Sequence, residues 1–425
     1  MSTSFQDRRL AAIPRGLASA TPLVAVRALG SEIWDADGKR YIDFAAGIAV
    51  LNVGHRHPKV IEAVKAQIDR FTHTSFQVMA YEPYLQLAEA LNDLAPVRGS
   101  ANTLLLNSGS EAVEAAVKIA RMATGRSAVI AFAGAFHGRT LMATTLTGKV
   151  ANYKRGFGSM VPEVYHVPFP SPGSGLTTAD TLGALDFLLS VDVDPERVAA
   201  IIVEPIQGEG GFNPAPAEML AALRALCDRH GILLIADEVQ TGFARTGRMF
   251  AVEHSGIAPD LIAVAKGMGG GFPLAGVIGR ADIMNAGDPG SLGSTYGGSP
   301  VACAAGLAVL DIIRDERLAD RAMAIGERIA ARMAALAGRA DLIPISPPRG
   351  MGAMIAFDIL SATDGKPDPA AVKMVMARAR ELGLIILSCG THGQAIRLLP
   401  PLTASDQIVE EGLTALEEAL SRKSI

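Results

Sequence analysis

Three short apolar segments of this chain each end at a charged residue. The segments and the residues that follow them are Val198–Val203 with Glu204, Ile232–Ala236 with Asp237, and Leu261–Ala265 with Lys266. Runs of this length, rich in Ile, Val and Leu, are typical of strands buried on both faces of a parallel sheet. Ligands of open parallel sheets bind beyond the carboxyl ends of the strands. The pattern therefore predicts two acids and a lysine at one edge of one sheet.

A lysine and a carboxylate at such an edge suit Schiff-base chemistry. A lysine amine attacks a carbonyl only when it is deprotonated, and a buried or crowded site lowers its pKa. Pyridoxal phosphate acts as an electron sink only while its ring nitrogen stays protonated, and a carboxylate against that nitrogen holds the proton. Lys266 and Asp237 fit these two requirements. We therefore expect pyridoxal 5'-phosphate as the cofactor.

A phosphate site is expected where a strand at 103–106 runs through a turn of small residues into a helix. Ser108 and Glu111 form an S-x-x-E capping pair, which marks the start of that helix. Backbone N–H groups and the dipole at a helix N-terminus bind phosphate, so Gly109 and Ser110 are candidate ligands. The chain contains no GxxxxGK[ST] motif, which excludes an NTPase P-loop. Further along, the aromatic face of Phe136 offers a surface for the cofactor ring.

The elements that must position these residues follow from periodicity and turn signals. Residues 31–44 predict a hairpin around Asp37-Gly38, and 60–70 and 84–95 predict helices. Residues 45–58 read as a loop. The stretch 167–195 is expected to be an irregular, proline-rich connection, and the block from Ala199 to Gly276 to hold three strands with helices between them.

Beyond about residue 315 the pattern of expected helices and strands changes. Alanine-rich amphipathic helices are expected at 318–336 and 369–382, alternating with strand-like runs at 354–360, 384–388 and 395–400. We interpret this region as a smaller α+β domain that the N-terminal hairpin completes. The predicted division is an N-terminal segment 1–55, a large cofactor-binding domain 56–315 and a small domain 316–425.

Composition narrows the function classes. The chain has 425 residues, a net charge of −4 and no basic stripe, which argues against nucleic acid as the main partner. No apolar run is long enough for a membrane helix, and the N-terminus lacks the apolar core of a secretory signal. The 3 cysteines are far apart and odd in number, so we expect no disulfide framework, no metal site and a reduced, cytoplasmic setting.

Six motifs together point to one enzyme family. In chain order they are NSGSEAVEAAVKIAR, FHGRT, EPIQGEGG, LLIADEVQTGFARTG, AKGMGGGFPLAG and GSTYGGSP. The set closely resembles the class III, fold-type I aminotransferases, which use pyridoxal phosphate, and within them the bacterial 4-aminobutyrate aminotransferases. The resemblance covers about residues 10–420. It implies an α/β fold with a mostly parallel seven-stranded sheet between helices.

The resemblance also implies roles for the residues near the cofactor ring. Lys266 would bind the cofactor covalently and then carry a proton between two carbons, and Asp237 would pair with the pyridinium. Gln240 would hydrogen-bond the ring hydroxyl, Val239 would pack under the ring, and Glu204 would support the site from behind.

Further positions of the same motifs would complete the cofactor site. Gly109 and Ser110 would bind the phosphate, helped by Thr295 from a second subunit of a homodimer or a dimer of dimers. Phe136, where many relatives carry Tyr, would stack on the ring with His137 beside it.

Four residues would recognise the substrates, by the same resemblance. Arg139 and Arg397 resemble the family's two carboxylate clamps, because a guanidinium pairs with a carboxylate through two bonds. Glu209, counted with the catalytic residues, would pair with Arg397 while an amino acid with one carboxylate is bound, and would swing away for glutamate. Ile48 would form a pocket wall.

The implied reaction is transfer of the amino group of 4-aminobutyrate to 2-oxoglutarate by a ping-pong mechanism, giving succinate semialdehyde and glutamate. Rivals on the same scaffold act on 5-aminovalerate, ornithine or acetylornithine, or are dialkylglycine decarboxylases. The 5-aminovalerate enzymes are the hardest to separate, because one methylene is worth only about 1–3 kcal/mol in a pocket. A non-catalytic binding protein would not need Lys266, Asp237 and Gln240 together, and a nucleotide-binding protein would carry GxGxxG or GxxxxGK[ST].

Overall fold

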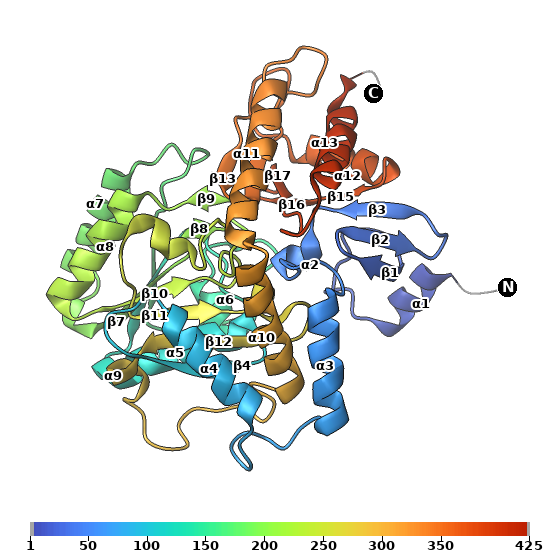
Figure 1. Ribbon diagram of the computed structural model, residues 1–425. Helices are drawn as coiled ribbons and strands as arrows, with labels where there is room; N and C mark the ends of the chain where they lie inside the picture. The colour runs from blue at the N-terminus through green and yellow to red at the C-terminus, as the bar shows by residue number, and fades with distance from the viewer. Residues whose placement is uncertain (1–3, 423–425) are drawn as a thin grey trace.

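A seven-stranded sheet forms the centre of the chain in a computed structural model that describes residues 4–422 (Figure 1). Its strands, in spatial order, are β4 (Ala101–Leu106), β12 (Ala275–Arg280), β11 (Leu261–Val264), β10 (Leu233–Asp237), β7 (Val198–Val203), β5 (Ala128–Phe132) and β6 (Val164–Val167). Strand β12 is antiparallel to both neighbours, and the other pairs are parallel. The predicted α/β class with a mostly parallel sheet is confirmed.

The strands are buried because both faces of the sheet are covered. On β7, Ala200 and Ile202 pack in the core beneath helix α5 (Gly109–Thr124), whereas Ile201 and Val203 face the core of α7 (Thr178–Val191) and α8 (Ala217–His230). This alternation follows from the two-residue period of a strand. Every residue of β7 is buried, which explains its unbroken apolar sequence.

Further helices cover the central sheet or belong to the segments around it. Among them, α3 and α4 pack against α10, and α10 continues towards α11 (Figure 1). Their bounds are α1 (Phe5–Ala12), α2 (Ala46–Ala49), α3 (Pro58–Arg70), α4 (Glu82–Leu94), α6 (Leu141–Leu146), α9 (Ala281–Met284) and α10 (Pro300–Asp315). In the described residues, no helix is long and apolar enough to cross a membrane.

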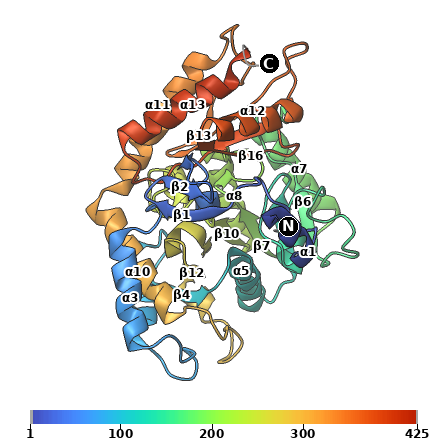
Figure 2. The ribbon, with the colours of Figure 1, turned by 90° about the vertical axis from the view of Figure 1, so that its right-hand side faces the viewer.

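Two smaller sheets flank the C-terminal helices α11 (Leu318–Leu336), α12 (Pro369–Glu381) and α13 (Asp406–Leu420), which Figure 2 shows grouped together. One sheet orders β1 (Ala25–Leu29), β2 (Glu32–Asp35), β3 (Arg40–Asp43) and β15 (Leu384–Ile385). The other orders β13 (Arg349–Met351), β14 (Met354–Asp358), β17 (Ala395–Leu398) and β16 (Leu387–Cys389). The parallel pairing of β15 with β3 joins the predicted hairpin to the C-terminal region; the division into domains stays a prediction.

Three expectations were wrong. The stretch 167–195 contains α7, which begins at a capping box between Thr177 and Asp180, although the proline-rich part before it is irregular. Only the short 3₁₀ helix η2 (Ala251–Ser255) lies between β10 and β11 in place of an expected α-helix. The predicted loop at 45–58 contains the short α2 and the first residue of α3. In addition, strand β12 was not predicted.

A buried arginine connects three distant parts of the chain. The guanidinium of Arg245, 0% exposed, donates to Asn52 Oδ1 (2.6 and 3.2 Å), to the carbonyl of Ala353 (3.1 Å) and to that of Pro400 (2.6 Å). Asn52 in turn donates to the carbonyl of Phe243 at 2.8 Å. Because a buried polar group must be hydrogen-bonded, these contacts hold the N-terminal, central and C-terminal segments in one arrangement.

The packing of α11 on the turn between β13 and β14 generates a test of stability. A Cβ at Gly326 would lie 2.0 Å from the carbonyl oxygen of Gly352. Alanine ordinarily stabilises a helix interior by roughly 0.5–1 kcal/mol over glycine, but overpacking against main chain costs about 1–3 kcal/mol. We expect Gly326→Ala to lower the thermal unfolding midpoint in calorimetry. Its control is Gly183→Ala on α7, where nothing lies within 4 Å; this change should raise the midpoint slightly, and an equal rise for both variants would contradict the tight packing.

Candidate active site

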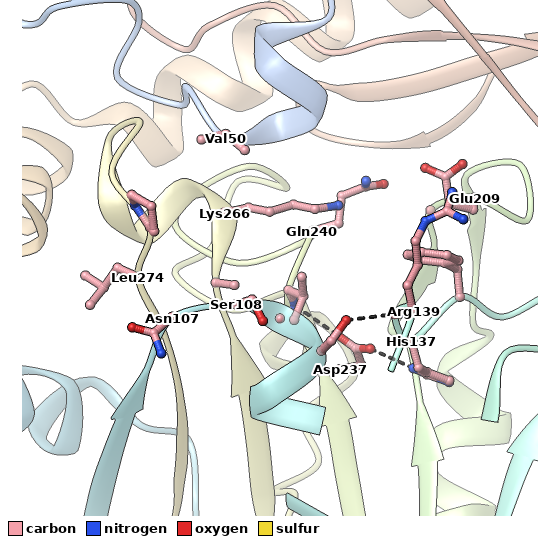
Figure 3. A pocket seen from close by; sticks show the side chains of 18 of the residues that line it. Val50, Asn107, Ser108, His137, Arg139, Glu209, Asp237, Gln240, Lys266 and Leu274 are labelled. Atoms are coloured by element: carbon pink, nitrogen blue, oxygen red, sulfur yellow. Dashed lines mark hydrogen bonds and ion pairs between the residues drawn. The ribbon is translucent and has the colours of Figure 1, made fainter. Parts of the chain in front are cut away.

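A cavity of about 510 Å³ lies at the carboxyl ends of β7, β10 and β11 (Figure 3). Most of the residues predicted from the sequence line it: Gly109, Ser110, Phe136, His137, Arg139, Glu204, Glu209, Asp237, Val239, Gln240 and Lys266. They come from segments far apart in the chain, and the sheet brings them together. The lining of the cavity is mainly apolar, with charged groups at a few points, as is usual for a small-molecule site.

Lys266 enters the cavity from the start of the 3₁₀ helix η3 (Lys266–Gly269), directly after β11 and Ala265. Burial lowers the pKa of its ammonium group to about 8, although the charge of Glu209 acts in the opposite direction. Arg397 adds to the lowering. Within residues 4–422, no carboxylate lies within ion-pair distance of Lys266. A substantial fraction of this amine is therefore uncharged and nucleophilic near pH 8.

Asp237 and His137 form a buried pair on the floor of the cavity (Figure 3). His137 Nδ1 donates to Asp237 Oδ2 at 2.6 Å, and the backbone N–H of Val239 donates to Oδ1 at 3.1 Å. Burial lowers the pKa of His137, but the hydrogen bond to Asp237 and its charge outweigh burial, so the pKa lies above its ordinary value. These two bonds fix the orientation of the Asp237 carboxylate.

Glu204 also lines the cavity, and its carboxylate holds two loops. Its Oε1 accepts from the backbone N–H of Phe136, and its Oε2 from that of Gly208, both at 2.8 Å. Burial raises the pKa of Glu204 to about 7, with a further rise from the charge of Asp237. Since both oxygens accept main-chain hydrogen bonds, Glu204 holds the backbone of Phe136 and Gly208 in place at the cavity.

The N-terminus of α5 borders the cavity opposite Lys266. Within the described part of the chain, the backbone N–H groups of Gly109 and Ser110 have no acceptor, as expected for the first residues of a helix. A Cβ on Gly109 would lie 2.8 Å from Val239 Cγ1, so only glycine lets this turn approach Val239 so closely. Ser110 Oγ accepts from the backbone N–H of Arg139 at 3.1 Å. The predicted strand, cap and helix are confirmed: Ser108 accepts from Glu111 at the N-cap of α5.

The residues present fit pyridoxal phosphate. Lys266 supplies an amine, Asp237 a fixed carboxylate, and α5 two N–H groups with a favourable dipole for phosphate. In addition, the Oε1 atom of Gln240 is buried without a hydrogen-bond partner in the described residues. A buried acceptor left in this way is costly in a protein interior and suits a donor on a ligand.

Two arginines belong to the site: Arg139 lines the cavity, and Arg397 lies beside it. Arg397, on β17 and 5% exposed, forms an ion pair with Glu209. Its charge lowers the pKa of Glu209 against the effect of burial. Arg139 is exposed on the loop before α6 (Figure 3). Its guanidinium carbon lies 4.8 Å from the ring centre of Tyr153.

Arg397 is not part of the lining itself, and two further predicted residues, Ile48 and Thr295, lie away from the cavity. Ile48 is 43% exposed and is not part of the lining, where Val50 lies instead. Thr295 is exposed on the loop before α10. The roles given to both remain predictions. The sequence analysis did not single out several lining residues that lie within its motifs, nor Val50, which lies outside them. The residues within the motifs are Asn107, Gly138, Gly208 and the run from Gly271 to Leu274.

Known proteins are similar to this chain in sequence and in fold. The chain matches the family Aminotransferase class-III over residues 15–420. It is 51% identical to the 5-aminovalerate aminotransferase DavT of Pseudomonas putida, over 98% of each chain. It is 48% identical to the 4-aminobutyrate aminotransferase GabT of Escherichia coli, over 97% of each.

Solved structures give the same result. An amine transaminase from an uncultivated Pseudomonas species, solved in its PLP-bound form, has a TM-score of 0.86 at 32% identity, covering 96% of this chain and 97% of that chain. An aminotransferase from Bacillus anthracis has a TM-score of 0.89 at 28% identity over 100% of both chains. The chain belongs to the class III aminotransferases of fold-type I, which depend on pyridoxal phosphate.

Proposed function

We propose that this enzyme transfers the amino group of 4-aminobutyrate to 2-oxoglutarate in two half-reactions, with succinate semialdehyde and glutamate as products. The observation that carries the proposal is the ion pair of Arg397 with Glu209 beside a cavity that Arg139 also lines. The enzyme needs to bind first a substrate with one carboxylate and then a substrate with two.

The ion pair allows one site to bind two substrates that differ by one negative charge. A carboxylate common to both would bind Arg139. With 4-aminobutyrate bound, Arg397 has no substrate carboxylate to pair with, and a buried cation left alone costs several kcal/mol. Glu209 supplies the missing negative charge. With 2-oxoglutarate or glutamate bound, the second carboxylate would pair with Arg397 and Glu209 would turn away.

The proposed cofactor contacts use the groups that line the cavity. Gly109 and Ser110 would hold the phosphate, Asp237 would keep a proton on the ring nitrogen, and Gln240 would accept from the ring hydroxyl. Val239 and Phe136 would enclose the ring between them, with His137 orienting Asp237. When bound, pyridoxal phosphate supplies the electron sink that allows an amino group and a carbonyl to exchange.

Lys266 would be both nucleophile and base. Its pKa of about 8 leaves part of the amine uncharged near neutral pH, so its Nζ can accept a proton from the substrate carbon that bears the amino group and then donate it to a second carbon. The apolar walls of the cavity exclude water from this transfer.

A second candidate substrate is 5-aminovalerate. A relative with 51% identity carries that name, compared with 48% for the 4-aminobutyrate relative. One methylene changes binding in a pocket by only about 1–3 kcal/mol, so activity on both is expected. Ornithine and acetylornithine are less suited, because each carries a nitrogen substituent beside the carboxylate that would bind Arg139.

A homodimer, or a dimer of dimers, completes the proposal. Thr295 is exposed on its loop and lies outside the cavity of its own chain, which supports a role at the phosphate site of a neighbouring subunit. The three cysteines are all buried and free, which agrees with the proposed cytoplasmic setting.

The substrate assignment is tested by steady-state kinetics with 2-oxoglutarate as acceptor. We expect the kcat/KM values for 4-aminobutyrate and 5-aminovalerate to differ by no more than about 200-fold. Both values should exceed those for ornithine and acetylornithine. A higher value for ornithine would refute the substrate assignment and leave the family and cofactor intact.

The role of Arg397 is tested by Arg397→Ala. The variant should lower the rate constant of the 2-oxoglutarate half-reaction by about 100-fold or more, since a lost charged contact costs roughly 3–5 kcal/mol. The 4-aminobutyrate half-reaction should lose much less. Stopped-flow absorbance of the cofactor measures each half-reaction separately, and equal losses in the two would contradict the assignment.

The environment of Lys266 predicts a pH dependence for cofactor uptake by the apoprotein. Because the amine reacts when uncharged, the rate should rise with pH to a midpoint near 8, well below the ordinary lysine value of 10.5. Glu209→Gln removes a negative charge that raises this pKa, so the midpoint should move down; Arg397→Met should move it up. Absorbance at the cofactor band follows the reaction, and shifts in the same direction for both variants would contradict this electrostatic account.

A further inference from the structure

The segment between α6 and β6 contributes an aromatic side chain next to the site that the roles above leave unused. Tyr153 is half-buried, and its ring packs against Phe136 with 5.0 Å between centres and 54° between planes. Phe136 lines the cavity directly, so Tyr153 forms a second layer behind it.

The guanidinium of Arg139 depends on these two rings. Its carbon lies 4.8 Å from the centre of Tyr153 and 6.0 Å from that of Phe136. Within residues 4–422, the Arg139 side chain makes no hydrogen bond or ion pair, and the residue is exposed. An arginine on an exposed loop has many rotamers, and a cation–π contact is the remaining interaction that selects among them.

The same short segment is anchored on the other side of the site through Lys149. Its Nζ lies 5.9 Å from the Tyr153 ring centre and donates to the carbonyl of Gly390 at 3.0 Å. The N–H of Gly390 donates to the carbonyl of Glu209 at 2.9 Å. Tyr153 is therefore held by Phe136 and by a segment tied to the backbone of Glu209, which makes its ring a fixed platform.

Resting on the proposed function, we propose that Tyr153 is a positioning residue for Arg139: its ring holds the guanidinium where it receives the substrate carboxylate, and so helps the enzyme select ω-amino acids over amines without a carboxylate. Burial raises the pKa of the Tyr153 phenol, so the ring stays uncharged at neutral pH. The contact with Arg139 is made by the ring face, and the hydroxyl is not required.

The test compares two amino donors in the first half-reaction, 4-aminobutyrate and n-butylamine, which lacks the carboxylate. Their ratio of rate constants at subsaturating donor, followed by cofactor absorbance, measures carboxylate selection. Tyr153→Leu and Tyr153→Met should reduce the ratio by about threefold to thirtyfold, the range of a cation–π contact. Tyr153→Phe keeps the ring and should restore most of it. A structural role would lower both rates alike and leave the ratio unchanged.

A double-mutant cycle identifies the group through which Tyr153 acts. In the background of Arg139→Met, changing Tyr153 to Leu should alter the ratio no further, whereas additive losses would overturn the proposal. If Tyr153→Leu and Tyr153→Met both keep the wild-type ratio, the role proposed for Tyr153 is overturned, and the proposed function still stands. If the wild type itself does not prefer 4-aminobutyrate over n-butylamine, the proposed function fails, and the role of Tyr153 fails with it.

Discussion

The parallel pairing of β7, β10 and β11 is the constraint on which the site depends. Ala236 lies beside Val203, and Asp237 lies beside Ala263. Glu204 and Asp237 therefore leave the sheet at the same level, and Lys266 follows three positions beyond Ala263. A shift of one residue in β10 would turn Asp237 to the other face. Ile235, two residues earlier and on the same face as Asp237, packs in the core beneath α5, so the buried apolar pattern fixes where the carboxylate points.

This edge concentrates buried charge, and the chain balances it with main-chain groups. Glu204 accepts from two backbone N–H groups, and Glu238 accepts from those of Ala251 and Val252 as well as from Thr241. Burial raises the pKa of each of these two acids to about 7. Arg245, without a carboxylate at ion-pair distance in residues 4–422, is satisfied by Asn52 and two carbonyls. Each group is costly to bury without hydrogen bonds, and the bonds that satisfy it tie separate segments of the chain together.

The sequence carried enough information for the sheet edge and the phosphate turn, because those features are local. The three runs before Glu204, Asp237 and Lys266 coincide with β7, β10 and β11 within one residue. Helix α7 was missed because the prolines before it dominate the pattern, and β12 because its glycines resemble a loop. The contact of Arg397 with Glu209 joins residues 188 positions apart, so it came only from the family resemblance.

Glu209 and Arg397 also set the electrostatic conditions for Lys266. Glu209 raises the pKa of this lysine and Arg397 lowers it. Under the proposed function, a monocarboxylate leaves Glu209 paired with Arg397, and a dicarboxylate brings its own second carboxylate to Arg397 as Glu209 turns away. One negative charge thus faces Arg397 in both half-reactions. The pKa of Lys266 can then stay near the same value with either substrate, as an enzyme that uses one amine in both directions requires.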